Sequence, residues 1–302
     1  MENKIDIKKE ILKTIIWFDF FCHPLSSWEL FKFLNIKIDY NIFLVALSEL
    51  SGEFKIVNIN SFWCLAGRED IVEERFKRFN YFKFKIKKAK RFTKLISFLP
   101  SIQGVFISNI VGDHNLKKGS DIDFFIITST GKIWLTRFFC TFVAKILGLR
   151  PNRKTKENKI CLSFYIDDSN LNLEPYLYNE KDWYFIYWLA GLELIFSKQE
   201  FLNKFWDNNA WLNKYLPNFF IKQNNIQNKK NSKKENKKVK ISFIENFFKK
   251  IQLKIMPQKL KEQSLDSLGV ILGDHIIKLI LDDKRPYFID KFDRAIDFIE
   301  NK

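Results

Sequence analysis

The chain is poor in the residues that make turns and in those that bind soft metals. Its 302 residues include 10 glycines, 7 prolines, 4 cysteines and 3 histidines. The few glycines and prolines, together with 33 phenylalanines, argue against a turn-rich all-β fold and favour helices and long buried strands. The cysteines lie far apart in apolar surroundings and lack metal-ligand spacing, which predicts free, buried thiols in a reducing compartment. They are Cys22, Cys64, Cys140 and Cys161.

Several familiar motifs are missing as well. The sequence has no Walker loop, no Gly-x-Gly-x-x-Gly, no His-Glu-x-x-His and no nucleophile elbow. Its charged, amphipathic beginning is not typical of a signal peptide. The most apolar helix candidate, residues 183–196, is too short to cross a bilayer and contains Glu193. We therefore expect a cytoplasmic protein without a membrane span.

What the chain has in surplus is positive charge, with a net charge of +16. Such a surplus suits polyanionic partners such as nucleotides or nucleic acid. A general bias toward Lys and Asn, with lysines on solvated faces, explains it equally well. Part of the charge lies in a Lys/Asn-rich segment without apolar periodicity, residues 222–240, which is expected to be a disordered linker or loop.

Residues 1–67 have the element order of a winged-helix-like module. Apolar periodicity predicts helices near residues 6–23, 26–34 and 39–50, followed by two short strands at 54–59 and 61–65. In a DNA-binding version the third helix would enter the major groove, but here it carries no Arg or Lys. A structural or protein-contact role is therefore favoured over DNA reading.

The rest of the chain predicts an α+β fold. Residues 68–99 predict a basic amphipathic connecting helix, broken or bent near its middle, that packs one face and solvates the other; a nucleic-acid contact is the alternative. Residues 100–180 alternate strands at 104–109, 121–128 and 160–166 with a helix at 134–149, which indicates a mixed sheet core. Residues 181–302 are expected to form a helical region, with helices near residues 183–196, 199–215, 241–255, 260–283 and 286–300. Its charged cluster, Lys278 with residues 282–285, is expected to be an ion-pair network before Pro286.

Two aspartates stand two residues apart at the start of a very apolar run. Gly119-Ser120-Asp121-Ile122-Asp123 leads directly into residues 124–128, which are β-branched and aromatic and predict a buried strand. Residues i and i+2 of a strand face the same side, so Asp121 and Asp123 point together. Two aligned carboxylates can hold Mg²⁺ and leave room for substrate phosphates. Capping of a turn explains one aspartate, but not a second charge that enters an apolar strand.

A strand at residues 105–109, a loop at 110–119 and the Ser-Asp-Ile-Asp run heading a second strand resemble the nucleotidyltransferase fold of the DNA polymerase β superfamily. The runs at 120–128, 132–137 and 159–164 look like a group of uncharacterised bacterial nucleotidyltransferase-like proteins. The resemblance covers about residues 100–220. It implies that Asp121 and Asp123 bind Mg²⁺ beside a nucleoside triphosphate. Two metal ions of this kind can clamp the attacking and leaving oxygens of an in-line displacement.

The resemblance also suggests substrate contacts. Where the family has a Gly-Ser pair that binds the triphosphate, this chain has Ser108 and Asn109, which can donate hydrogen bonds. Ser120 and Lys118 precede the aspartate pair and are expected to contact phosphates, the lysine as a point charge.

The family's third carboxylate lies on a neighbouring strand. The matching strand, residues 160–166, carries none. By strict alternation Cys161, Ser163, Tyr165 and Asp167 share one face, so Asp167 at the strand's end is the candidate for the third catalytic carboxylate.

The expected function is therefore a Mg²⁺-dependent transfer of a nucleoside monophosphate from a nucleoside triphosphate to an acceptor, with pyrophosphate leaving. The alternative is a catalytically inactive protein of the same fold that acts as a nucleotide-binding, nucleic-acid-binding or protein-interaction module. The position of a third carboxylate discriminates between the two: one close to Asp121 and Asp123 favours the enzyme, whereas Cys161, Ser163 and Tyr165 alone favour the module.

Overall fold

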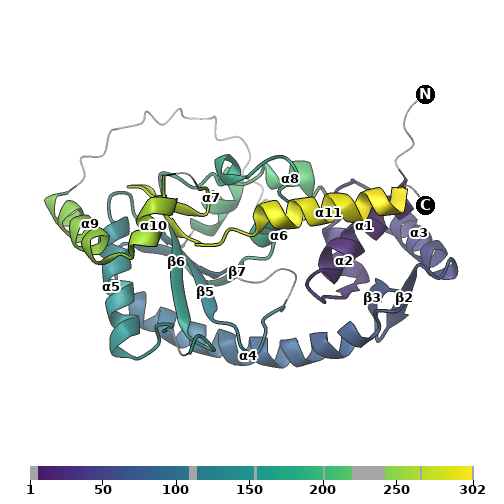
Figure 1. Ribbon diagram of the computed structural model, residues 1–302, viewed down its shortest axis with the longest axis horizontal. Coiled ribbons are helices and arrows are strands. Elements are labelled where there is room, and N and C mark those ends of the chain that lie inside the picture. Colours follow the sequence, from purple (N-terminus) through teal and green to yellow (C-terminus); the bar gives the residue numbers. More distant parts are fainter. Residues whose placement is uncertain are drawn as a thin grey trace.

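The computed structural model describes residues 6–108, 114–152, 155–199, 201–219, 242–265 and 267–300. Its centre is a six-stranded mixed sheet with helices on both faces, which is an α+β architecture (Figure 1). The strand order is β7-β4-β5-β6-β9-β8, and within it β5 and β6 are parallel while the other neighbours are antiparallel. The strands are β4 (Ile102–Ile107), β5 (Ile122–Thr128), β6 (Ile160–Asp167), β7 (Glu193–Ser197), β8 (Val270–Leu272) and β9 (Ile276–Leu279).

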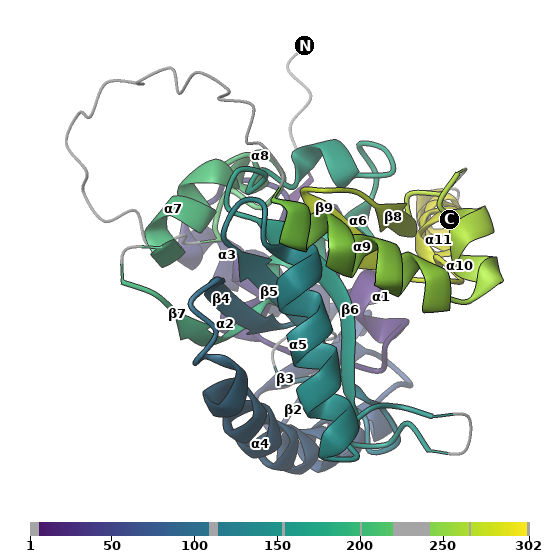
Figure 2. The ribbon, with the colours of Figure 1, turned by 90° about the vertical axis from the view of Figure 1, so that its left-hand side faces the viewer.

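The two central strands form because their sequences are almost wholly apolar and are covered on both faces. Parallel neighbours need a crossover connection, and α5 (Ile133–Ile146) supplies it between β5 and β6. One face of the sheet packs against α5, α4 (Asp70–Ile96) and α9 (Phe243–Ile255). Figure 2 shows α5 and α9 side by side over this face, with α4 running beneath them. The predicted helices at 68–99 and 134–149 and the three predicted central strands are confirmed.

Helix α9 is fixed to α5 by buried polar contacts. The Glu245 carboxylate accepts hydrogen bonds from the backbone N–H groups of Trp134 (2.6 Å) and Leu135 (3.1 Å). It thereby satisfies donors at the start of α5 that have no partner inside the helix. Gln252, about two turns further along α9, donates to the Trp134 carbonyl at 2.7 Å.

The N-terminal residues form three helices and a small antiparallel sheet of order β1-β3-β2. Each helix begins at a capping side chain: Asp6, Ser26 and Asp39 accept hydrogen bonds from backbone N–H groups of the first turn. The predicted helices and strands of this region are therefore present. Their bounds are α1 (Ile7–Asp19), β1 (Leu25–Ser26), α2 (Ser27–Lys32), α3 (Tyr40–Gly52), β2 (Ile56–Ile59) and β3 (Phe62–Leu65).

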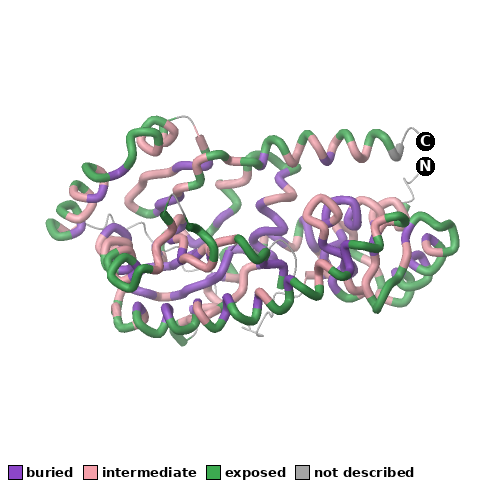
Figure 3. The backbone as a smooth tube through the Cα atoms, turned by 60° about the horizontal axis from the view of Figure 1, so that its bottom comes forward, coloured by how far each residue is buried: buried purple, intermediate pink, exposed green. Residues whose placement is uncertain are grey.

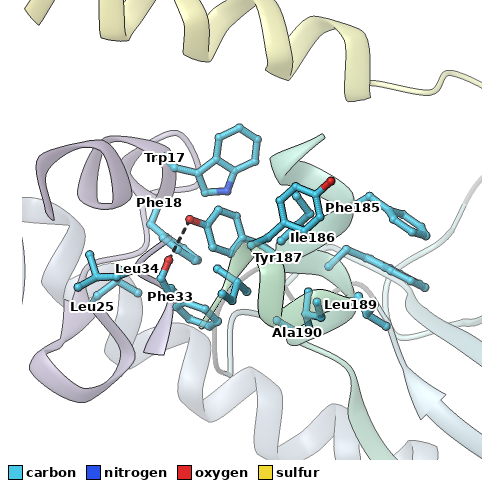
Figure 4. Close-up of a cluster of buried hydrophobic side chains, with 14 of the residues drawn as sticks. Trp17, Phe18, Leu25, Phe33, Leu34, Phe185, Ile186, Tyr187, Leu189 and Ala190 are labelled. Carbon is cyan, nitrogen blue, oxygen red and sulfur yellow. Dashed lines mark hydrogen bonds between the residues drawn. The ribbon is translucent and has the colours of Figure 1, made fainter. Parts of the chain in front are cut away.

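The second face of the sheet shares one hydrophobic core with this N-terminal region. The link is α6 (Trp183–Ala190), whose side chains contact both. Tyr187 packs against Phe18 and Phe33, and its hydroxyl donates to the Phe33 carbonyl at 3.2 Å (Figure 4). Buried residues are accordingly concentrated in the sheet, in α6 and in α1, whereas the outer helices are largely exposed on one side (Figure 3).

Helix α4 runs along the molecule from the N-terminal region to the sheet (Figure 1). It continues without interruption through 27 residues, so the helix is not broken near its middle. Its buried Arg78 donates to the Phe21 carbonyl (2.6 Å) and to Asn115 Oδ1 (2.7 Å). These bonds connect the N-terminal region to the loop that leads into β5.

The expectation of a helical region over residues 181–302 is wrong in part, because half of the central sheet comes from it. The predicted helix at 183–196 ends at Ala190, and β7 follows as an edge strand beside β4. The predicted helix at 260–283 is replaced by a short helix and the β8–β9 hairpin, which turns at Asp274-His275 between two β-branched runs. The remaining elements are η1 (Glu174–Tyr176), α7 (Phe201–Asn208), α8 (Leu212–Tyr215), α10 (Gln258–Gln263) and α11 (Arg285–Glu300).

The predicted helix at 199–215 is divided into α7 and α8. The division lies at Asn209, a buried residue whose side chain accepts from the Leu173 backbone N–H at 3.0 Å and donates to the Leu171 carbonyl at 2.9 Å. A side chain that bonds to a neighbouring loop in this way competes with helix continuation. The Lys/Asn-rich segment at 222–240 lies outside the described residues. Within them, no helix has both the length and the apolar character needed to cross a bilayer.

Candidate functional site

The two aspartates lie where β5 and β6 begin and where the neighbouring β4 ends. Asp121 precedes β5, Asp123 is its second residue, and Cys161 is the second residue of the neighbouring β6. Ligand atoms of these three side chains lie within 4.8 Å of one another. The expectation that Asp121 and Asp123 point together is confirmed. Two carboxylates at this separation fit a divalent cation, since hard cations take carboxylate oxygens.

Cys161 occupies the place beside the aspartates that a third carboxylate would need. It lies directly opposite Asp123 in the β5–β6 pair, and its thiol lies within 4.8 Å of the Asp123 carboxylate. A thiol is a poor ligand for Mg²⁺ and a good one for softer metals such as Zn²⁺. Among the described residues, the group of potential metal ligands at this place contains no third carboxylate.

Burial and mutual repulsion dominate the electrostatics of this group. Loss of solvation, and next the neighbouring Asp121 charge, raise the pKa of Asp123 above its usual value. Burial, and next the Asp123 charge, raise the pKa of the Cys161 thiol well above its usual value. A cation between these side chains would stabilise their charged forms, which is the condition for metal binding at neutral pH.

Asp167 does not join the pair. In the parallel register Asp167 lies opposite Thr128, whereas Cys161 lies opposite Asp123. Five residues of β5 separate the two places, a distance of about 16 Å at roughly 3.3 Å per residue. The buried Asp167 carboxylate instead accepts from Ser169 Oγ (2.6 Å) and contacts His275 Nδ1 at 2.8 Å. The expectation that it reaches back to Asp121 and Asp123 is therefore wrong in its geometry.

The side chains of β6 do not alternate strictly between the two faces of the sheet, because the strand contains a β-bulge. The β5–β6 register shifts between Asp123 and Phe125, where Phe125 lies opposite Phe164. A β-bulge of this kind places one extra residue in one strand and reverses the faces beyond it. Consequently Tyr165 packs in the core beneath α5, while Phe164 packs in the core that contains α6.

Ser108 and Ser120 position the backbone around the aspartates. The Ser108 backbone N–H donates to the Asp123 carbonyl at 2.9 Å, and its hydroxyl reaches the same oxygen at 3.3 Å. The Ser120 hydroxyl donates to the Lys117 carbonyl at 2.9 Å. Because both hydroxyls are engaged within the protein, these contacts support a structural role next to the site. Lys118 is exposed, and Asn109 lies outside the described residues.

Lys85 is a buried cation next to the pair that sequence reasoning missed. Its Nζ donates to both the carbonyl and the hydroxyl of Ser120, directly before Asp121. Burial lowers the pKa of Lys85, while the charges of Glu157 and Asp121 oppose that shift. The signal was present: Phe82, Lys85, Ile86 and Ala89 follow the three- and four-residue spacing of the buried face of α4.

A cavity of about 340 Å³ opens beside Asp123. Its floor is formed by Asp123, Cys161 and Ser163, and its apolar wall by side chains of α6. Its far side is the segment from Lys278 in β9 to Arg285 at the start of α11. The charged cluster of the C-terminal region therefore lies next to the aspartate pair, a proximity that no local sequence pattern indicates.

The predicted ion-pair network of this cluster is present around Arg285. Its guanidinium contacts Asp182 at 3.1 Å and Asp283 at 2.6 Å, and its side chain is 3% exposed. Lys278 is 2% exposed and donates to the Leu268 carbonyl at 3.0 Å. Burial, and next the Arg285 charge, lower the pKa of Lys278 to about 7.

Comparison of the chain with models of protein families, with curated proteins and with solved structures gave no significant match.

Proposed function

We propose that the chain is a metal-dependent nucleotidyltransferase, which moves a nucleoside monophosphate from a nucleoside triphosphate to an acceptor. The observation that carries this proposal is the pairing of Asp121 and Asp123 at the entrance of a buried strand, directly beside a cavity. Phosphoryl-type transfer depends on positioning and on neutralisation of charge more than on covalent participation by the protein. An aligned carboxylate pair beside a substrate-sized cavity meets both requirements.

Each residue of the site has a distinct part in this proposal. Asp121 and Asp123 hold the cation, Mg²⁺ being the expected one, and Ser108 holds the backbone of Asp123 through two hydrogen bonds. Lys85 holds Ser120 and so fixes the chain that enters the site. A bound divalent cation would neutralise triphosphate oxygens and help to align them for in-line attack. Asp167 has no part in the chemistry, because it lies at the opposite end of the sheet.

The resemblance noted in the sequence supports finer statements about the fold. We assign residues 100–180, together with the strands that the C-terminal region adds, to a nucleotidyltransferase-like sheet core. We assign residues 1–67 to a winged-helix-like module, which is supported by the order of helices and strands. The exposed side of α3 presents Ile42 and Val45, each more than half exposed, and no basic residue. That surface suits contact with protein better than contact with DNA.

A screen of the four ribonucleoside triphosphates with Mg²⁺ or Mn²⁺ and a cell extract as acceptor source tests the proposal. We expect transfer of label from an α-labelled nucleotide and metal-dependent release of pyrophosphate. Asp121→Asn and Asp123→Asn should abolish both, whereas Asp207→Asn, which changes an exposed aspartate on α7, should change neither. Equal label transfer by the wild type and by the two site variants would refute the proposal.

A second candidate function is a non-catalytic module that binds a metal–nucleotide complex. The observation in its favour is Cys161, which stands where the resemblance calls for a carboxylate and which is the outcome expected from the sequence for a module. The enzyme is placed first because the two paired carboxylates alone can hold a divalent cation beside the cavity. This candidate predicts that nucleotide and metal raise the melting temperature of the wild type but not of Asp123→Asn, with no label transfer in the screen. The screen and the melting temperature together separate the two functions.

A further inference from the structure

The cavity beside Asp123 combines an apolar aromatic wall with charged and polar groups on its other sides. Phe185 and Trp188 of α6 are stacked with their ring centroids 5.0 Å apart, and Trp188 is stacked on Phe164 of β6 at 5.4 Å. All three line the cavity and are at most 9% exposed. A volume of about 340 Å³ lies at the lower end of the range for small-molecule pockets. Such a wall suits a planar ring.

Lys278 is the buried cation of this cavity that makes no direct ion pair among the described residues. Arg285, the other buried cation that lines it, is neutralised by Asp182 and Asp283. For Lys278, no ion pair is present among the described residues, and its ammonium group donates to a single carbonyl, that of Leu268. A buried charge without a counter-charge is costly, and it carries more donor hydrogens than one carbonyl can accept. Lys278 therefore has donor capacity available to a bound molecule.

The place of Lys278 relative to the aspartates is set by the sheet. Lys278 lies opposite Phe164, and Asp123 lies opposite Cys161 three residues earlier in β6. The two positions are therefore about 10 Å apart along the strands, at roughly 3.3 Å per residue, and about 10 Å apart across two strand spacings, which gives a separation of roughly 14 Å. The Lys278 Nζ is 5.8 Å from the Phe164 ring centroid and 5.6 Å from that of Phe185. The base of a nucleotide stacked on this wall would have one edge near the ammonium group. Its sugar would then lie between the base and a phosphate bound at Asp123.

On the basis of the nucleotidyltransferase function proposed above, we infer that this cavity binds the base of the nucleotide substrate and that Lys278 selects bases with a keto oxygen at the facing edge. In its charged form, which the negative charge of a bound triphosphate favours, the ammonium group of Lys278 donates to the keto oxygen of uracil or guanine and has no acceptor capacity. The corresponding position of cytosine or adenine carries an amino group, which is itself a donor and leaves the buried donor unpaired. A site built around a buried hydrogen bond rejects a ligand that cannot make it more strongly than an apolar pocket rejects a change of size.

The test is the affinity of the full chain for non-hydrolysable analogues of the four nucleoside triphosphates, measured by titration calorimetry with Mg²⁺ present. We expect the uridine analogue to bind about tenfold or more tightly than the cytidine analogue, and guanosine more tightly than adenosine by a similar factor. Lys278→Met should bring uridine and cytidine within about twofold of each other, mainly by weakening uridine. Lys284→Met, which removes an exposed lysine at the rim of the same cavity, should keep the preference.

The outcomes separate this inference from the function on which it rests. Equal affinity of the wild type for all four analogues, or a preference for cytidine and adenosine, overturns the selection by Lys278 but leaves metal-dependent nucleotide binding in place. A preference that survives in Lys278→Met also overturns it. If no analogue binds to the wild type in the presence of Mg²⁺, both proposals fail. The comparison within the wild type needs no variant, so the inference is testable even if Lys278→Met does not fold.

Discussion

Cys161 lies opposite Asp123 across the parallel strands β5 and β6, with its thiol within 4.8 Å of the aspartate carboxylate. This relationship decides how the candidate site is understood. It places a soft, weakly acidic group where a third hard ligand would complete a binding site for Mg²⁺. The proposed activity therefore depends on two carboxylates, and several consequences can be measured.

Replacement of Cys161 by Asp should strengthen Mg²⁺ binding and lower the stability of the metal-free protein. Three carboxylates within a few ångströms repel one another, so we expect the melting temperature in EDTA to fall by several degrees. Mg²⁺ should then raise it by more than it raises the wild type, and the Mg²⁺ affinity should increase about tenfold. Cys161→Ser, which adds no charge, is the control. An equal Mg²⁺-induced shift in Cys161→Asp and Cys161→Ser would show that Cys161 does not face the cation.

Replacement of Lys85 by Met should loosen the entrance to β5. The variant loses the donor to the Ser120 carbonyl and hydroxyl, and we expect unfolding free energy to fall by about 1–3 kcal/mol. Metal affinity should fall as well, because the backbone before Asp121 is less constrained. Lys87→Met removes an exposed lysine from the same helix and should leave both quantities unchanged. Wild-type metal affinity in Lys85→Met would mean that Ser120 is held well enough by its other contacts.

Lys278 should make stability depend on pH. Arg285 opposes its charged form while Asp283 and Asp182 favour it, and burial dominates, so that its pKa in the folded protein is about 7 instead of 10.5. The unfolded chain then binds more protons between these values, and this contribution to stability increases as pH rises from about 7 to about 10.5. Below pH 7 the full cost of the buried charge is present.

Lys278→Met should therefore be more stable than the wild type at low pH, by on the order of 1–3 kcal/mol at pH 6, and the gain should shrink at pH 9. Chemical denaturation at the two pH values measures this difference. Loss of the hydrogen bond to the Leu268 carbonyl lowers the variant's stability equally at both, so the change with pH is the informative quantity. A gain that is the same at pH 6 and pH 9 would show that Lys278 does not change its protonation in this range.

The N-terminal region and the sheet should unfold together. Phe18 is fully buried and contacts Tyr187 of α6 at a ring-centroid distance of 4.9 Å. Phe18→Ala should cost about 3–5 kcal/mol, a typical value for deletion of a buried ring. Because the core is continuous, we expect a single thermal transition that shifts as a whole when followed by calorimetry. Two transitions, of which only one moves, would mean that residues 1–67 fold independently.

The sequence predicts the aspartate pair because its signal is local. Asp121 and Asp123 lie two residues apart in front of an apolar strand, and a strand places such residues on one side. Lys85 also had a local signal, since it lies at a position of α4 whose neighbours at three- and four-residue spacing are apolar. Both could be located from a short window of residues.

Other parts of the site depend on contacts between distant segments. Asp167 was expected near the pair because alternation was continued through a bulge and because the direction of β6 relative to β5 was not known. Lys278 lies in β9, where the sequence predicts a helix, because a short apolar run does not distinguish a strand from a helix. Its pairing with β6 joins residues more than one hundred positions apart. The cavity arises only when α6, β6 and β9 have packed together.

The most direct test of the account is calorimetric titration of the full chain with a non-hydrolysable uridine triphosphate analogue, in Mg²⁺ and in EDTA, for the wild type and for Asp121→Asn/Asp123→Asn. The proposed function predicts that the wild type binds the analogue only with Mg²⁺ present. It also predicts a loss of affinity of about a hundredfold or more in the double variant. Binding of the same strength in EDTA, or in the double variant, would contradict it.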